Sequence, residues 1–166
     1  MTMNYKKLVF LLSMVFLVVS FANAAGEKYI GAAKCKMCHN KADKGAQFTK
    51  WEASKHSKAF SDLKPADQKN AKCLKCHSTS AGADQALVAT ITVEEGVSCE
   101  SCHGPGSAYK TATNMKKEKA MTLGMIEPKE AVCVKCHNKE SPNFKGFNYK
   151  EYAAKIAHAD PSPKTN

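Results

Sequence analysis

A pentapeptide pattern that occurs four times constrains this chain of 166 residues more than any other feature. In each copy, two residues separate a pair of cysteines, and a histidine follows the second cysteine at once. Together the copies use all eight cysteines and four of the six histidines. They span Cys35–His39, Cys73–His77, Cys99–His103 and Cys133–His137. A fold for this sequence must therefore accommodate four identical chemical units at close spacing.

This pattern predicts covalent haem. The two thiols can add to two vinyl groups on one edge of a porphyrin, and the next residue places an imidazole on the iron from the same side. Thioredoxin-type pairs, structural zinc sites and disulfides also use closely spaced cysteines, but none of them requires a histidine after the second cysteine. We expect four haem c groups, attached through Cys35, Cys38, Cys73, Cys76, Cys99, Cys102, Cys133 and Cys136. Their proximal iron ligands would be His39, His77, His103 and His137.

The first residues have the pattern of an export signal. Lys6 and Lys7 precede an apolar run from Leu8 to Phe21, and the small-residue sequence Ala22–Ala24 follows it. Because the run is shorter than the ~20 apolar residues of a membrane-spanning helix, we expect residues 1–24 to be a cleaved Sec signal peptide rather than an anchor. Residues 25–166 would form a single tetrahaem domain in the periplasm, or outside the cell, without a stable membrane anchor.

The composition favours a fold organised by its cofactors. After the predicted signal, Leu, Ile, Val and Phe are sparse, whereas Lys, Ala and Gly are plentiful, so the polypeptide core should be thin. Four closely packed haems would fill the middle of the molecule. We expect a compact, mainly α fold with little strand, in which residues 47–60, 109–120 and 148–158 are helical and residues 88–93 form a strand.

All 25 basic residues are lysines, and the formal net charge is +10. Such an excess can indicate nucleic-acid binding. The predicted export and the lack of arginine, which is the usual reader of phosphate and base edges, argue against a nucleic-acid partner. The lysines are better explained as partners of haem propionates and as a surface that steers redox proteins toward docking. We expect a monomer or a weak oligomer.

The second axial ligand of each iron decides whether the four haems are equivalent. Only His56 and His158 remain once the proximal histidines are assigned, and we predict both to be distal ligands. Methionine is the next natural ligand, and three methionines follow the third motif: Met115, Met121 and Met125. Met115 is preferred, because a helix over 109–120 could aim it at a haem, although all three could simply pack. One iron could stay five-coordinate, or take a lysine, a new amino terminus or a residue of a second subunit.

Three segments of the chain resemble the cytochrome c554 family of multihaem cytochromes: Ala33–His39, Trp51–His56 and Gly96–Gly106. The resemblance implies a mostly helical periplasmic protein with closely stacked haem pairs. It also implies that most irons have two histidine ligands, that His56 is a distal ligand, and that the second haem in sequence, on His77, is high-spin. The family pattern has a third spare histidine soon after the Gly-Pro-Gly turn, where this sequence offers Met115 instead.

These features favour a carrier that passes single electrons between a donor and an acceptor in a bacterial respiratory chain, rather than an enzyme. Two alternatives stay open. An open iron could reduce nitric oxide, nitrite, hydroxylamine or peroxide, although only lysines and a few tyrosines remain to assist such a reaction. Subunits could also stack into an assembly and complete each other's ligand sets.

Overall fold

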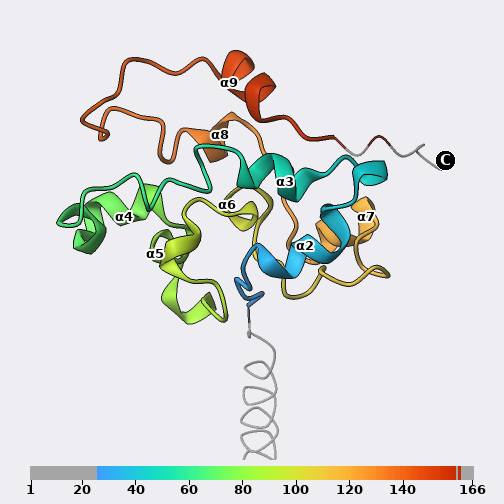
Figure 1. Cartoon of the computed structure of the whole chain (residues 1–166). Coiled ribbons are helices and arrows are strands. Elements are labelled where there is room, and N and C mark those ends of the chain that lie inside the picture. Colours follow the sequence, from blue (N-terminus) through green and yellow to red (C-terminus); the bar gives the residue numbers. More distant parts are fainter. Residues whose placement is uncertain (1–25, 160, 162–166) are drawn as a thin grey trace, which may run out of the picture.

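The computed structural model describes residues 26–159 and 161, and its helices are short (Figure 1). The α-helices are α2 (Ala33–His39), α3 (Gln47–Glu52), α4 (Ala71–His77), α5 (Thr79–Gly82), α6 (Cys99–His103), α7 (Lys117–Thr122), α8 (Glu130–Cys133) and α9 (Tyr149–Ile156). Single turns of 3-10 helix lie between them: η1 (Ala42–Lys44), η2 (Asp67–Lys69), η3 (Gln85–Leu87) and η4 (Val93–Glu95). In Figure 1, α4 and α2 lie on opposite sides of the molecule, with α6 and α8 between them.

The described residues contain no β-strand, so the strand expected over 88–93 is wrong. Val88 forms only an isolated bridge with Tyr29. The Tyr29 amide donates to the Leu87 carbonyl at 2.8 Å, and the Ala89 amide donates to the Tyr29 carbonyl at 3.0 Å. The chain then turns into η4, and one short neighbouring segment is too little to sustain a sheet. The expectation of a mainly helical fold is confirmed.

The helix expected over 47–60 is too long, because α3 ends at Glu52. Beyond it, the Ser57 hydroxyl donates to the carbonyls of Glu52 and Ser54, at 2.9 Å each. The His56 amide donates to the Ser54 hydroxyl at 3.2 Å. Serine side chains that bond nearby backbone groups compete with the helical ladder. His56 therefore lies in a series of turns after α3.

The helix expected over 109–120 is also wrong, since turns and bends fill this segment until α7 begins at Lys117. The Tyr109 hydroxyl donates to two carbonyls at the end of α6, at 2.9 and 2.7 Å. The Asn114 side-chain amide donates to the Ala108 carbonyl at 2.8 Å. These bonds hold the backbone in turns, so Met115 lies in the loop before α7 rather than on a helix face. By contrast, α9 falls inside the helix expected over 148–158.

The polypeptide core is thin, and a buried acid forms part of it. The buried apolar side chains are Ile30, Ala32, Phe48, Ile91, Tyr109 and Ala120. Glu100 is 2% exposed, and its carboxyl oxygens accept the amides of Ile30 at 3.0 Å, Gly31 at 2.8 Å and Gly106 at 2.6 Å. This arrangement, the Glu100 clamp, joins the segment before α2 to the turn after α6.

The predicted signal peptide, residues 1–24, lies outside the described residues. The prediction of a single domain over 25–166 stays a prediction. Within the part of the chain that the structure describes, no helix has both the length and the apolar character that crossing a membrane requires.

Candidate haem-binding site

Each Cys-x-x-Cys-His motif is wound into a helical turn. The first three motifs lie within α2, α4 and α6. The fourth begins at the end of α8, and its turn is closed by the His137 amide, which donates to the Cys133 carbonyl at 2.9 Å. Residues three and four apart in a helical turn share a face, so each motif presents two thiols and an imidazole on one side. All eight cysteines are free. The structure therefore does not contain the disulfides that were considered as an alternative.

Four histidines form two facing pairs. The ring centres of His56 and His137 are 6.1 Å apart with their planes at 70°, and those of His103 and His158 are 5.9 Å apart with their planes at 71°. An iron between two imidazoles needs ring centres about 6 Å apart, because each metal–nitrogen bond is about 2 Å and each nitrogen lies about 1 Å from its ring centre. Each pair joins a motif histidine to a spare one. This donor set fits two bis-histidine haem irons.

Three of the paired imidazoles, those of His56, His103 and His137, are held toward their neutral form. Burial lowers the pKa of His56, and the neighbouring His137 lowers it further. Burial also lowers the pKa of His103, with a further contribution from His158, and it lowers the pKa of His137. Neutral imidazole is the form that binds a metal. The pKa shifts of these three rings therefore favour the protonation state that an iron requires.

Contacts between thiols set the order of the four motifs in space. Four pairs of thiols from different motifs interact, either by a hydrogen bond or electrostatically: Cys35 with Cys99, Cys102 with Cys133, Cys102 with Cys136, and Cys76 with Cys136. The hydrogen bond between the first pair lowers the pKa of Cys35 and raises that of Cys99. The second pair lies where α6 packs against α8. The motifs therefore follow one another in the spatial order first, third, fourth, second.

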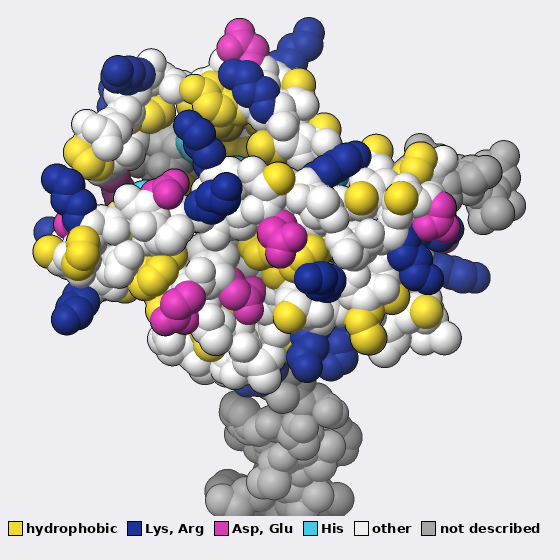
Figure 2. All heavy atoms as spheres, viewed as in Figure 1, with side chains coloured by type: hydrophobic (Ala, Val, Ile, Leu, Met, Phe, Trp, Pro, Cys, Tyr) yellow, Lys and Arg dark blue, Asp and Glu magenta, His cyan; other side chains and the backbone are white. Residues whose placement is uncertain are grey.

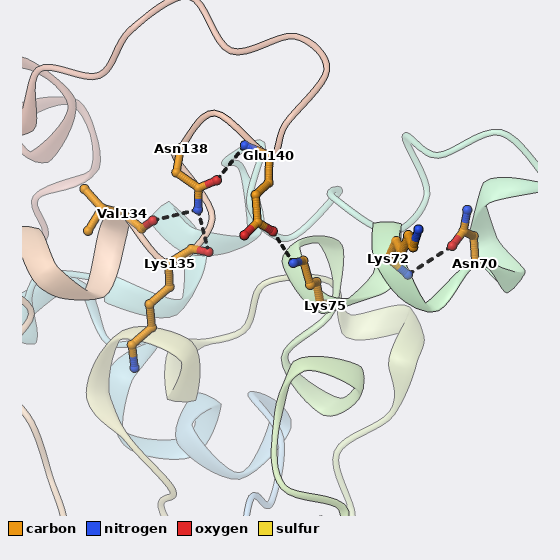
Figure 3. A network of polar contacts seen from close by, with 7 residues as sticks. All are labelled: Asn70, Lys72, Lys75, Val134, Lys135, Asn138 and Glu140. Atoms are coloured by element: carbon orange, nitrogen blue, oxygen red, sulfur yellow. Dashed lines mark hydrogen bonds and ion pairs between the residues drawn. The ribbon is translucent and has the colours of Figure 1, made fainter.

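A polar network also joins the second motif to the fourth (Figure 3). Lys75, inside the second motif, forms an ion pair with Glu140 in the loop after the fourth. Asn138 shapes this loop: its side-chain amide donates to the carbonyls of Val134 at 2.9 Å and Lys135 at 3.0 Å, and its side-chain oxygen accepts the Glu140 amide at 2.8 Å. Exposed ion pairs contribute little stability, so the network matters mainly for placing the loop beside α4.

Two residues that the sequence analysis did not single out fix the position of His56. The Trp51 indole donates to the Val97 carbonyl at 2.8 Å, and the Val97 amide donates to the His56 carbonyl at 2.9 Å. Gly96 permits this approach, because its φ is +67° and a Cβ there would lie 2.8 Å from the His56 carbonyl oxygen. Trp51 was noticed only as part of a resembling segment. Val97 also lies in a resembling segment, but nothing there pointed to His56, because tertiary structure alone brings the two together.

The first motif shares a pocket with a methionine. Cys35, Cys38 and His39 line this pocket together with Tyr109 and Met115. The three motif residues are those predicted to hold one haem, so the structure brings Met115 to the first of the four sites. Its ligand role stays a prediction, and the same holds for the roles of the cysteines and histidines.

The second motif has a different environment. The Nδ1 atom of His77 donates to the Ala59 carbonyl at 2.7 Å, which orients the ring and leaves Nε2 for an iron. In residues 26–159, ring contacts pair four histidines with one another but bring no second histidine to His77 or His39. Because Met115 lines the pocket of His39, His77 is the motif histidine that is left without a candidate distal ligand among the described residues. The open iron expected on His77 stays a prediction.

Comparison with known proteins matches the part of the chain that contains the first three motifs. Residues 34–104 match the family model described as cytochrome c554 and c-prime. Over these residues the chain is similar to the cytochrome c554 family. Cytochrome c-554 of Nitrosomonas europaea is a relative that is 31% identical over 105 residues. That match covers 52% of this chain and 43% of the relative, so less than half of the relative's length is represented. No solved structure matches the chain.

Similarity to the cytochrome c554 family implies covalently attached haem c, and the free thiols with facing imidazoles suit such a group. The family match encloses the first three motifs and His56. The fourth motif, Met115 and His158 lie beyond it. Assignments for the last third of the chain therefore rest on its own sequence and geometry.

Proposed function

We propose that the protein is a periplasmic tetrahaem c-type cytochrome that passes single electrons between redox partners in a bacterial respiratory chain. The observation that carries the proposal is the presence of two histidine pairs at iron-bridging distance, 6.1 and 5.9 Å between ring centres, within four motifs linked by thiol contacts. The export pattern in residues 1–24 supports a periplasmic location.

The chain's own residues would anchor and orient the cofactors. The eight thiols tether four haem c groups, and each motif histidine binds its iron from one face. His56 would bind the opposite face of the iron on His137, and His158 that of the iron on His103. When bound, haem supplies one-electron chemistry. Because the ligands come from segments fixed by hydrogen bonds and burial, they do not need to move when an electron arrives.

The order of the motifs supports an electron relay. Since thiols of successive motifs interact, the groups that they anchor must be neighbours, and short separations favour transfer between them. The relay would run through the first, third, fourth and second motifs. Its two ends would lie at α2 and α4, on opposite sides of the molecule in Figure 1. A donor and an acceptor could then dock at different places.

Docking to redox proteins with acidic surfaces is part of this proposal. Figure 2 shows lysines spread over the visible face, with acidic side chains among them rather than gathered in a separate area. Dispersed positive charge steers an acidic partner and speeds its encounter without requiring a large interface. Transient electron-transfer contacts are typically small, and this surface suits them.

Exported protein is expected to carry four covalent haems. Intact-mass spectrometry, after expression in a bacterium that attaches haem c, should give the mass of residues 25–166 plus four haems. Replacing both Cys133 and Cys136 with serine should remove one haem, because these two sulfurs form the two thioether bonds that attach it. Val134→Ala, a change inside the same motif, should leave four. Three or fewer haems on the unaltered protein would contradict a tetrahaem cytochrome.

A second candidate function, reduction of a small nitrogen oxide or peroxide, is favoured by the lack of a facing histidine at His77 in the described residues. An open iron on His77 should bind carbon monoxide when the protein is reduced, and we expect about one of the four haems to do so. Binding without turnover of nitric oxide, nitrite, hydroxylamine or peroxide supports the carrier. Turnover well above that of free haem would instead favour the enzyme, and no carbon monoxide binding would exclude an open iron.

A further inference from the structure

The pocket beside the first motif contains a thioether that can complete a haem site. We propose that Met115 is the distal ligand of the iron bound by His39, so that this haem has a histidine–methionine ligand set. The inference rests on the proposed tetrahaem function and deepens it. Met115 lines the same pocket as Cys35, Cys38 and His39, the three residues that would hold one haem.

Hydrogen bonds fix the loop that carries Met115. Tyr109 is 6% exposed, and its hydroxyl donates to two carbonyls at the end of α6, at 2.9 and 2.7 Å. Asn114, the residue before Met115, donates from its side-chain amide to the Ala108 carbonyl at 2.8 Å. The loop is thereby tied to the turn after the third motif. Met115 is consequently presented to the first motif from a defined position.

The other methionines of the described chain have different surroundings. Met37 is 81% exposed and Met121 is 43% exposed, whereas Met115 is half buried. Met125 is also half buried, but it follows α7, where its amide donates to the Ala120 carbonyl at 3.0 Å, and it does not line the pocket. Met115 is the one that combines partial burial with a place beside motif residues.

Two lysines, Lys34 and Lys110, also line this pocket and are the rivals of Met115. Both are exposed. A lysine amine must lose its proton before it can bind a metal, and its ammonium form is strongly hydrated. Methionine is neutral and polarisable, and its sulfur is a natural axial ligand of haem iron. The chemistry of the pocket therefore favours Met115.

Methionine ligation would give one of the four haems a different reduction potential from the others. A methionine in place of a second histidine raises the reduction potential of a haem. The first motif lies at one end of the spatial order set by the thiol contacts. An electron that enters the relay would then reside preferentially on the haem at the α2 end.

Three variants of the haem-loaded mature protein test the ligand. Met115→Ala should convert one low-spin ferric signal in electron paramagnetic resonance into a high-spin signal, and should abolish the far-red absorption typical of sulfur on ferric haem. Met115→His should retain the low-spin signal, lose the far-red band and lower the potential of one haem in a potentiometric titration, because imidazole replaces the thioether. Met125→Ala, the matched control, should change neither the spectra nor the potentials.

Unchanged spectra and potentials in Met115→Ala would overturn the assignment. If Lys34→Ala or Lys110→Ala lost a low-spin signal while Met115→Ala kept its spectra and potentials, the ligand would be a lysine and the assignment to Met115 would be overturned. Intact-mass measurement separates this failure from failure of the proposed function. Fewer than four haems on the unaltered protein contradicts the tetrahaem carrier itself. Four haems together with a silent Met115→Ala variant contradicts only the ligation by Met115.

Discussion

Replacing Glu100 with leucine is expected to lower the free energy of unfolding by about 3 kcal/mol or more. The carboxyl group of Glu100 accepts three amides, those of Ile30, Gly31 and Gly106. Leucine accepts none of them, and each buried amide left without a partner costs about 1–3 kcal/mol. Urea unfolding of the haem-loaded protein, followed by far-ultraviolet circular dichroism, measures the change.

Two further variants make the Glu100 experiment specific. Glu100→Gln keeps one acceptor oxygen, so we expect it to lose about half as much stability as the leucine variant. Glu94→Leu alters a nearby exposed acid and should change stability by less than about 0.5 kcal/mol. Haem content should stay the same in all three, because no attachment residue is changed. A loss below about 1 kcal/mol in Glu100→Leu would show that the clamp does not hold the segment before α2.

His56→Ala is expected to convert one ferric haem of the four from low-spin to high-spin, which is about a quarter of the total iron signal. The structure places His56 opposite His137, with ring centres 6.1 Å apart, so its removal leaves that iron without a sixth ligand. His158→Ala should have an effect of the same size at the iron on His103. Electron paramagnetic resonance of the oxidised protein at low temperature measures both changes.

Added imidazole provides an internal test of these histidine variants. It should return the high-spin signal of His56→Ala to low-spin, because the free ligand occupies the position that the side chain has left. Lys55→Ala, at an exposed neighbouring residue, should leave the spectrum unaltered. If His56→Ala kept all four haems in their original spin states, the pairing of His56 with His137 would be wrong.

The helical class and the local shape of the four motifs could be predicted, because the spacing of two thiols and an imidazole is itself the spacing of a helical turn. Residues 88–93 and 109–120 were predicted incorrectly for a shared reason. Their local patterns suit a strand and a helix, but side-chain bonds to backbone groups outside these segments decide their conformation. Thr90, for example, donates to the Ile30 carbonyl at 2.7 Å, and Tyr109 donates to the end of α6.

The pairing of ligands could not be predicted, although the candidates could. Counting histidines leaves His56 and His158 as spare, but it does not say which iron each one faces. That depends on contacts such as the one between Trp51 and Val97, which lie far apart in the sequence. The burial of Glu100 could not be predicted either, because an acid between two cysteines is not typically buried. The amides that it accepts come together only in the folded chain.

The two facing histidine pairs interleave along the chain, since His103 lies between His56 and His137, and His137 lies between His103 and His158. Once each pair is joined through an iron, the two closed loops overlap across residues 103–137. In the chain-entropy account, a cross-link that closes a loop of several tens of residues restricts the unfolded ensemble by about 3–5 kcal/mol. Losing the iron from either histidine pair would therefore loosen residues 103–137, which the other pair also encloses. The irons would thus cross-link the chain, compensating for a core that has few apolar side chains.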